Sequence, residues 1–362
     1  MEKQYRAQLG DREVILETGK LAQQAGGAVV VRMGEAMLLV TATASSAPRE
    51  GVDFFPLTVD FEERRYAAGK IPGGFFKREG RPSTDAILLC RSVDRPLRPL
   101  FPEGYRNDVQ IIITPFAADQ ENDLETLSLI GASAALTISD IPFGGPVAGV
   151  KVAYVNDEYI INPLASQMEE SQLDLTVAGT AESVLMIEAG ANEFPEDKML
   201  EAIRRGHQAI QATIALQARM AEEIGKAKNP GVCVQLDPAV LQAVEGLAGT
   251  AIAEMVASGL DRGERKEQED RLREQVFAEV DPSFDKAAVA EAWGVLFQRA
   301  MRRRILDTGI RVDGRDLRTI RPLKAEVGLV PRVHGSGLFS RGESQVLSIT
   351  TLGTGTDEQS IE

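Results

Sequence analysis

The sequence predicts an α+β fold, in which a mixed sheet with helices is followed by an all-helical domain and by the start of a second sheet domain. Three observations support this order. Short segments rich in β-branched and aromatic residues, separated by Gly, Ser and Pro, fill much of residues 1–194. Apolar positions three and four apart, typical of helices, dominate residues 195–308. From Gly309 the strand-type pattern returns, together with a repeat of part of the first domain.

Strands and two longer helices are expected in the first domain. The predicted strands span residues 13–17, 29–32, 37–43, 54–60, 109–115, 147–155, 159–162, 173–179 and 183–189. Residues 34–35 (GE), between two apolar runs, predict a hairpin turn. One of residues 83–85 (STD) is expected to cap a helix that runs toward Arg95. A second, apolar helix is expected over residues 123–140, where the small residues 131–133 allow close packing.

Residues 195–308 predict one long helix followed by a compact helical domain. Two apolar stripes have helical spacing. They contain Met199, Ile203, Ile210 and Ile214 in the first stripe, and Trp293, Leu296, Phe297 and Met301 in the second. Turn-forming residues at 229–231, 258–259 and 281–282 divide the stretch. We expect these residues to serve packing and spacing rather than chemistry.

A repeat links the beginning of the sequence to its end. Residues 34–39 (GEAMLL) return 308 positions later as residues 342–347 (GESQVL), and both copies continue into Thr-rich strands. The second copy extends over only about 50 residues, and a partial sheet with open edges is not expected to be stable alone. We therefore expect the chain to be the front part of a longer protein that continues beyond Glu362.

The charge balance restricts any nucleic-acid site to a small area. Forty Lys and Arg residues against 54 Asp and Glu residues give a net charge of −14. A surface that binds polyanions everywhere is therefore excluded, and a nucleic-acid site must be a local basic groove in an acidic body.

Few residues are available for metal or nucleophilic chemistry. The two His and two Cys residues argue against a disulfide framework, a Cys-rich zinc site and most His-based mechanisms. No signal peptide or membrane-spanning apolar run is recognised, so a cytoplasmic protein without membrane contact is expected.

One basic stretch contrasts with this acidic background. Residues 64–98 hold nine basic and three acidic residues, a local charge of +6. Within the stretch, Phe75 and Phe76 directly precede Lys77 and Arg78 on a glycine-rich base. Aromatic rings can stack on bases, at about 1–3 kcal/mol per base, while the cations neutralise phosphates. This arrangement favours single-stranded nucleic acid. The alternative is a Phe pair that faces the core, beside solvated arginines.

Several longer motifs resemble the polynucleotide phosphorylase family. They are GGFFKREGRPS at 73–83, DRPLRPLFP at 94–102, IGASAAL at 130–136, IPF at 141–143, DGR at 313–315, IRP at 320–322, HGS at 334–336 and RGE at 341–343. The resemblance covers the whole chain in order. It implies a first ribonuclease PH-like core at 1–194, a long helix with an all-α linker domain at 195–308, and the truncated start of a second ribonuclease PH-like core at 309–362.

The family resemblance also implies an activity. It implies a nucleotidyltransferase that degrades mRNA from 3′ to 5′, using inorganic phosphate as co-substrate and releasing nucleoside diphosphates. Further implications are a cytoplasmic homotrimer that threads single-stranded RNA through its ring, and partner proteins in RNA degradation. In this family phosphate and Mg²⁺ bind to the second core. We therefore expect no catalytic and no metal residues within this chain, which alone should be inactive.

The first core departs from the family's catalytic pattern. Asp123 and Glu125 occupy the place where the second core carries its serine run, and two carboxylates would repel phosphate. They could form a metal pair or, alternatively, interact with a helix dipole. The first core is thus interpreted as a non-catalytic copy kept for assembly and RNA guidance. An alternative for this chain is a non-catalytic RNA-binding and assembly module of a ring-shaped RNA-degrading complex, and a third is a purely structural ring subunit.

The resemblance indicates which residues contact RNA. The predicted RNA-binding residues are Phe75, Phe76, Lys77, Arg78, Arg81, Arg91, Arg95 and Arg98. Lys77 stands where the family usually has Arg, which keeps the charge but loses bidentate phosphate contacts. For the last four arginines, charge pairing near a helix C-terminus and subunit contacts are the alternatives.

Overall fold

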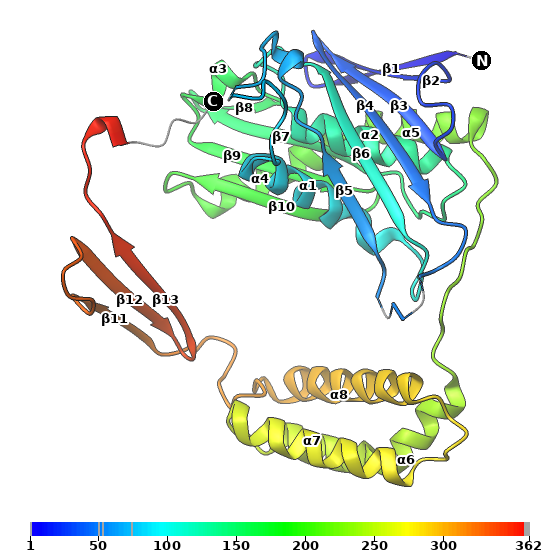
Figure 1. Cartoon of the computed structure of the whole chain (residues 1–362), viewed down its shortest axis with the longest axis vertical. Helices are drawn as coiled ribbons and strands as arrows, with labels where there is room; N and C mark the ends of the chain where they lie inside the picture. Colours follow the sequence, from blue (N-terminus) through cyan, green and yellow to red (C-terminus); the bar gives the residue numbers. More distant parts are fainter. Residues whose placement is uncertain (1, 50, 53, 74, 358–362) are drawn as a thin grey trace. The chain divides into compact units, whose positions relative to one another are not determined.

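The computed structural model describes residues 2–49, 51–52, 54–73 and 75–357. Gly74 of the aromatic loop motif and Glu362 are outside the described residues. The chain divides into two units, Met1–Gln235 and Leu236–Glu362, which are described separately (Figure 1).

Six strands of the first unit form a mixed sheet in the order β1-β2-β3-β4-β6-β5. The strands are β1 (Lys3–Leu9), β2 (Arg12–Thr18), β3 (Gly27–Met33), β4 (Ala36–Ala44), β5 (Leu57–Phe61) and β6 (Val109–Ala117). All neighbours are antiparallel except β5, which runs parallel to β6 at the sheet edge. Strand β1 is absent from the predicted strands, because Tyr5 and Leu9 are its only large buried residues.

A second, antiparallel sheet has the order β10-β9-β7-β8. Its strands are β7 (Ala148–Val155), β8 (Glu158–Ile161), β9 (Leu173–Gly179) and β10 (Val184–Ala191). Most of β9 is buried, whereas β10 is a largely exposed edge strand. All four strands lie where the sequence pattern predicts them.

Helices cover and connect the two sheets of the first unit. They are η1 (Arg65–Ala68), α1 (Thr84–Leu97), η2 (Arg98–Leu100), α2 (Leu124–Ile138) and α3 (Ala165–Met168). Ser83 caps α1, because its side chain accepts a hydrogen bond from the Ala86 amide. The buried helix α2 packs against β3 and β4 of one sheet and β7 of the other. A Cβ atom at Gly131 would lie 2.6 Å from Val40 Cγ2, so the predicted close approach at this small residue is confirmed.

The predicted long helix after residue 195 is two helices that belong to the first unit. Helices α4 (Glu196–Ala209) and α5 (Gln211–Ile224) meet at Ile210, whose φ and ψ are −72° and −13°. Their buried residues, including Ala202 and Met220, join the core of this unit. Gly206 lies on the same buried face four residues before the break, but a single Gly within a helical pattern does not by itself predict where a helix ends. The segment 195–308 is thus shared between the two units.

Three helices form the core of the second unit. They are α6 (Pro238–Ala257), α7 (Arg262–Glu279) and α8 (Lys286–Thr308). Among the described residues, α6 is the one helix long and apolar enough to cross a membrane by length and composition, with a mean hydropathy of 1.3. Six of its side chains, from Val240 to Val256, are buried in the helical cluster around Trp293. One third of the apolar window is buried, on the stripe that packs into this cluster.

The repeat found in the sequence is also a repeat of structure. The second unit ends in an antiparallel sheet of β11 (Leu323–Val327), β12 (Gly335–Arg341) and β13 (Ser344–Thr350), followed by η3 (Gly355–Asp357). The β12–β13 hairpin turns at Gly342, with φ of +61°, as β3–β4 turns at Gly34, with φ of +57°. Val31 and Leu38 of the first hairpin are fully buried, whereas the equivalent Phe339 and Val346 are 49% and 63% exposed.

Candidate nucleic-acid interface

Hydrogen bonds at two positions fix the base of the loop that carries the aromatic and basic residues. At the outer link, the backbone amide and hydroxyl of Ser83 donate to the Glu63 carboxylate, both at 2.8 Å. At the inner link, the Arg65 amide donates to Glu79 Oε1 at 2.8 Å. The segment between Arg65 and Glu79 is therefore closed at its base and projects as one loop.

The two phenylalanine rings of this loop lie in solvent. Phe75 is 93% and Phe76 is 74% exposed. Their ring centroids are 5.4 Å apart and the rings are nearly perpendicular, at 86°. The alternative prediction of a Phe pair facing the core is therefore wrong. Two adjacent aromatic rings in solvent make this loop tip a candidate binding surface.

Cations complete the tip of the loop. The Arg78 guanidinium carbon lies 5.3 Å from the centroid of the Phe76 ring, within cation–π range. Lys77 has a φ of +51°, in the left-handed region that a lysine rarely adopts. Both side chains are exposed, and neither has an ion-pair partner among the described residues. Residues 75–78 thus present two rings and two charges on one short segment.

The other four predicted arginines line a groove in the first unit, formed by β5, α1 and the base of the loop. The groove has a volume of about 1360 Å³. Its charged lining residues are Arg64, Arg65, Arg81, Arg91, Arg95 and Arg98, with Asp60, Glu62, Glu63, Glu79, Asp94 and Glu188. Phe75 to Arg78 do not line it. The predicted residues therefore separate into an exposed loop tip and a groove in which the charges of the two signs balance.

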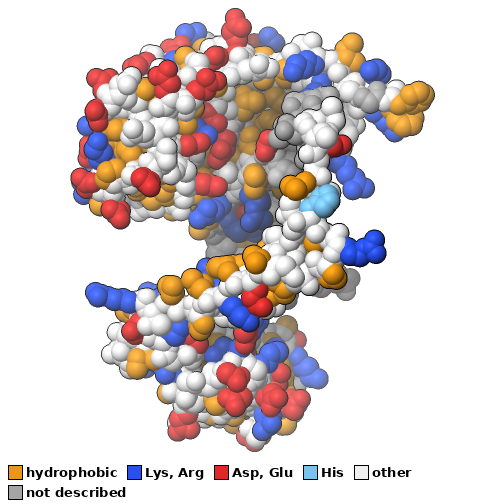
Figure 2. Space-filling view, turned by 90° about the vertical axis from the view of Figure 1, so that its left-hand side faces the viewer, with side chains coloured by type: hydrophobic (Ala, Val, Ile, Leu, Met, Phe, Trp, Pro, Cys, Tyr) orange, Lys and Arg blue, Asp and Glu red, His pale blue; other side chains and the backbone are white. Residues whose placement is uncertain are grey.

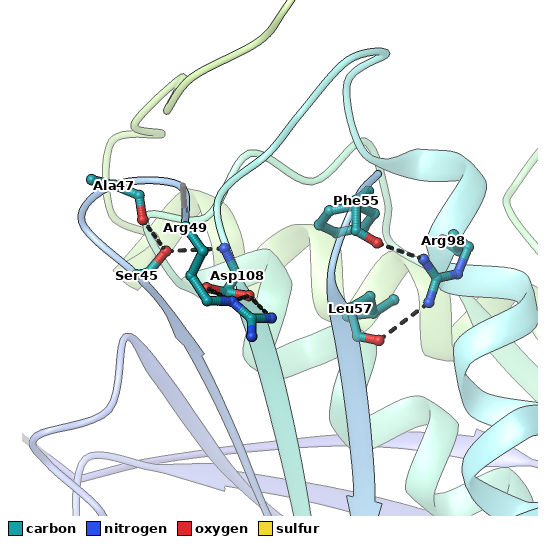
Figure 3. A network of polar contacts seen from close by, with 7 residues as sticks. All are labelled: Ser45, Ala47, Arg49, Phe55, Leu57, Arg98 and Asp108. Atoms are coloured by element: carbon teal, nitrogen blue, oxygen red, sulfur yellow. Dashed lines mark hydrogen bonds and ion pairs between the residues drawn. The ribbon is translucent and has the colours of Figure 1, made fainter. Parts of the chain in front are cut away.

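Arg98 has a structural role that its sequence position does not show. Its guanidinium pairs with Asp94 at 2.6 and 2.9 Å. It also donates to the carbonyls of Phe55 and Leu57 at 3.0 and 3.2 Å (Figure 3). It also lies 5.6 Å from the Phe55 ring centroid. All three of its nitrogens donate within the protein, and they connect the end of α1 to the start of β5. For Arg98 the alternative of charge pairing is therefore the one seen.

Arg81, Arg91 and Arg95 remain available for a ligand. All three are exposed, and none has a hydrogen bond or ion pair within the part of the chain that the structure describes. Arg91 and Arg95 share one face of α1 because they are four residues apart. Ile87 and Leu88 lie one turn earlier and are 52% and 54% exposed. The wall of the groove thus combines free cations with exposed apolar surface.

The carboxylates at the start of α2 interact with protein groups. Asp123 caps the helix, since its Oδ2 accepts from the Thr126 amide at 2.8 Å. Burial, followed by the charge of Asp123, raises the pKa of Glu125. Burial lowers the pKa of Lys151, but nearby carboxylates, Asp123 first, outweigh this effect and raise it overall. Lys151 also pairs with Asp174 at 3.3 Å.

Two alternatives were predicted for these carboxylates, a metal pair and an interaction with the helix dipole. Asp123 is the helix cap, so the helix-dipole alternative describes it. Across the described residues, no group of three or more His, Cys, Asp or Glu side chains is placed to hold a metal ion. The carboxylates of Asp123 and Glu125 also raise the pKa of Lys151, and the metal pair stays the alternative prediction.

One exposed aromatic residue on the same loop was not predicted from the sequence. Tyr66 on η1 is 54% exposed and Ile71 is 78% exposed. Tyr66 is a single aromatic residue between cations at positions 65 and 70, so the sequence shows no pair of aromatic residues there. An isolated aromatic residue inside a basic stretch is the signal that could have identified it.

Comparison with known proteins defines the class. Two models of the 3′ exoribonuclease family match the first unit, domain 1 at residues 10–142 and domain 2 at residues 145–209. The chain belongs to this family, and the predicted α+β, ribonuclease PH-like fold is confirmed. A third model, described as polyribonucleotide nucleotidyltransferase, RNA binding domain, matches residues 239–316. That description adds RNA binding to our expectation that the helical segment serves packing and spacing rather than chemistry.

The chain is also similar to curated enzymes that share one name. Polyribonucleotide nucleotidyltransferase from Roseiflexus castenholzii is 51% identical over 361 residues, which are 98% of this chain and 48% of the relative. The enzyme of the same name from Moorella thermoacetica is 49% identical over 369 residues, which cover 97% of this chain and 49% of the relative. The chain thus spans about half the length of these relatives. The predicted resemblance to the N-terminal portion of a polynucleotide phosphorylase is confirmed.

Proposed function

We propose that the complete protein is a phosphorolytic 3′-to-5′ exoribonuclease that degrades mRNA. A phosphate oxygen attacks the phosphorus of the terminal phosphodiester, and the bond to the 3′ oxygen of the preceding nucleotide breaks. The products are a nucleoside diphosphate and an RNA shortened by one nucleotide with a free 3′ hydroxyl. The observation that carries the proposal for this chain is the exposed pair Phe75 and Phe76 beside Lys77 and Arg78.

The proposed role of the first unit is to guide RNA. The rings stack on bases while the cations of the loop meet phosphates. Arg81, Arg91 and Arg95 in the groove are a second set of phosphate contacts, supported by their exposure. Arg98 serves this surface indirectly, because it fixes α1 to β5.

Phosphate and Mg²⁺ are proposed to bind in the part of the complete protein outside this chain. Supporting this division, Asp123 and Glu125 place negative charge at the start of α2, where phosphate would be repelled. We further propose a cytoplasmic homotrimer that threads single-stranded RNA and works with other RNA-degrading proteins. The family description of residues 239–316 supports an RNA contact in the second unit as well.

A second candidate describes this chain taken alone, as a non-catalytic RNA-binding and assembly module. One assay separates the two candidates. Poly(A), inorganic phosphate and Mg²⁺ are added to the 362-residue chain and to the complete protein, and ADP is measured. We expect ADP from the complete protein and none from the chain. ADP released by the chain would place the active site within these residues, and no ADP from either protein would contradict the phosphorolytic activity.

The same chain tests RNA guidance through salt. If about six cations of the first unit meet phosphates of one strand, the log–log plot of affinity against salt should have a slope near −4, since each single-strand phosphate contributes about 0.7. A flat salt response would instead support the purely structural subunit.

A further inference from the structure

A group of arginines on α8 was not part of the predicted interface. Arg299, Arg302 and Arg303 are exposed in the C-terminal half of this helix. Residues three and four apart are neighbours on a helix surface, so the three guanidinium groups lie on one side of α8. Leu306, seven residues after Arg299 and on the same side, is 70% exposed. The surface thus combines three cations with an apolar side chain.

These arginines have no partner that would explain them structurally. None of the three makes a hydrogen bond or ion pair with another described residue. Asp307 is four residues after Arg303, yet no ion pair joins them among the described contacts. Arg304 differs, because its Nη1 donates to the Val256 carbonyl at the end of α6. Of these four arginines, Arg304 is thus the one that is bonded within the described part of the helical unit.

Local helix energetics do not account for the group either. Like charges three and four residues apart repel each other and destabilise a helix. Cations near a helix C-terminus are favourable, but only within the last turn. Arg299 and Arg302 lie nine and six residues before Thr308, beyond that turn. An anion bound outside the protein would offset the repulsion.

The neighbouring helix α7 provides a contrast within the same unit. Lys266 pairs with Asp270 at 3.6 Å, and Arg271 pairs with Glu267 at 3.4 Å. Arg273 lies over the Phe277 ring, 5.7 Å from its centroid. These cations of α7 are therefore matched locally, whereas the three on α8 are not.

We propose that Arg299, Arg302 and Arg303 form a second RNA-binding surface that contacts the phosphates of single-stranded RNA. The inference rests on the proposed function, and the match of residues 239–316 to an RNA binding domain favours RNA over an acidic protein as the ligand. Guanidinium groups bind phosphate oxygens in a bidentate manner. The surface would hold the strand at a place other than the aromatic loop.

The test compares two triple variants of the 362-residue chain with the same change in charge. R299Q/R302Q/R303Q removes the α8 surface, and K266Q/R271Q/R273Q removes three locally matched cations from α7. Binding of a labelled oligo(A) of about 20 nucleotides is measured across a salt series. Three lost phosphate contacts should make the log–log slope about 2 less steep and weaken binding about a hundredfold at about 0.1 M salt. The α7 variant should retain the parental slope.

Three results would overturn the proposal. Equal losses in both triple variants would show a general charge effect. An unchanged α8 variant, with weakened binding in F75A/F76A, would remove this surface and leave the proposed function intact. Absence of RNA binding in the parental chain would contradict both. The variant R299K/R302K/R303K keeps the charge and should keep the salt slope of the parent. If the Gln and Lys triple variants also have the thermal unfolding curve of the parent, a folding defect is excluded as the cause of the weaker RNA binding in the Gln variant.

Discussion

Removing both exposed rings at the loop tip tests whether they stack on RNA bases. The variant F75A/F76A deletes side chains that are 93% and 74% exposed. The free energy of unfolding should therefore change by less than about 0.5 kcal/mol. Stacking contributes about 1–3 kcal/mol per base, so two rings contribute about 2–6 kcal/mol to binding. With about 1.4 kcal/mol per tenfold change, the lower value corresponds to a Kd about 30-fold higher.

The geometry of the pair refines this expectation. Because the rings are perpendicular, at 86°, one base cannot lie parallel to both, and each ring should serve a different base. Phe76 is also the ring under the Arg78 guanidinium. F76A therefore removes a cation–π contact, worth about 0.5–1 kcal/mol at exposed sites, in addition to a stacking face. The two single variants should each weaken binding, and their effects should combine in the double variant.

Fluorescence anisotropy with labelled oligo(A) at fixed salt measures these changes. Phe54 supplies a matched control, because it is 61% exposed but outside the loop. F54A should leave Kd within about twofold, and F75W/F76W should retain binding because Trp also stacks. A Kd for F75A/F76A within about threefold of the parent, or an equal loss in F54A, would refute the stacking argument.

Further predictions concern the surroundings of the interface. R98A should lower the free energy of unfolding by about 1–3 kcal/mol because two carbonyls lose their donor, while R95A should change it by less than about 0.5 kcal/mol; equal values in urea unfolding would contradict this. G131A should lower the free energy of unfolding by about 1–2 kcal/mol, because its Cβ would overpack against Val40. G246A in α6 has open space around its Cβ and should raise the free energy of unfolding by up to about 1 kcal/mol; thermal unfolding measures both. Burial raises the pKa of Glu125 in the folded state above its ordinary value of 4.5, so ionisation of Glu125 lowers the free energy of unfolding. E125Q should therefore be more stable than the parent at pH values above that raised pKa. The difference should vanish as the pH falls below 4.5, which a pH series of unfolding measures.

Strand positions could be predicted because burial of one face of a sheet makes apolar and polar residues alternate along the strand. In β4, buried Leu38 and Val40 alternate with half-buried neighbours, and the GE turn fixes the register with β3. The same logic failed for β1, where charged and amide side chains dominate. It also missed the break at Ile210, because the apolar spacing continues across the break and Gly206, four residues earlier, stays within α4.

The candidate site was predictable in composition but not in the role of each arginine. Arg91, Arg95 and Arg98 are alike in sequence, with spacings of four and three residues. Only the fold brings the carbonyls of Phe55 and Leu57, more than 40 residues away, to the guanidinium of Arg98. Such non-local partners leave no trace in a charge pattern. The exposure of Phe75 could not be predicted from the sequence either, since two adjacent Phe residues usually lie in a hydrophobic core.

The charge distribution explains why the proposed RNA contacts are local. Acidic side chains are scattered among basic ones over the larger body on the face seen in Figure 2, and the net charge of the chain is −14. At physiological salt a charge acts over only about 8 Å. The basic loop tip can therefore attract a phosphate that is already near it, and the same short range holds for the arginines of the groove and of α8. Under the proposed function, RNA that reaches Phe75 and Phe76 also gains stacking, which phosphate contacts alone do not supply. An acidic body with a few cationic contacts thus favours one path for a single strand over diffuse adsorption.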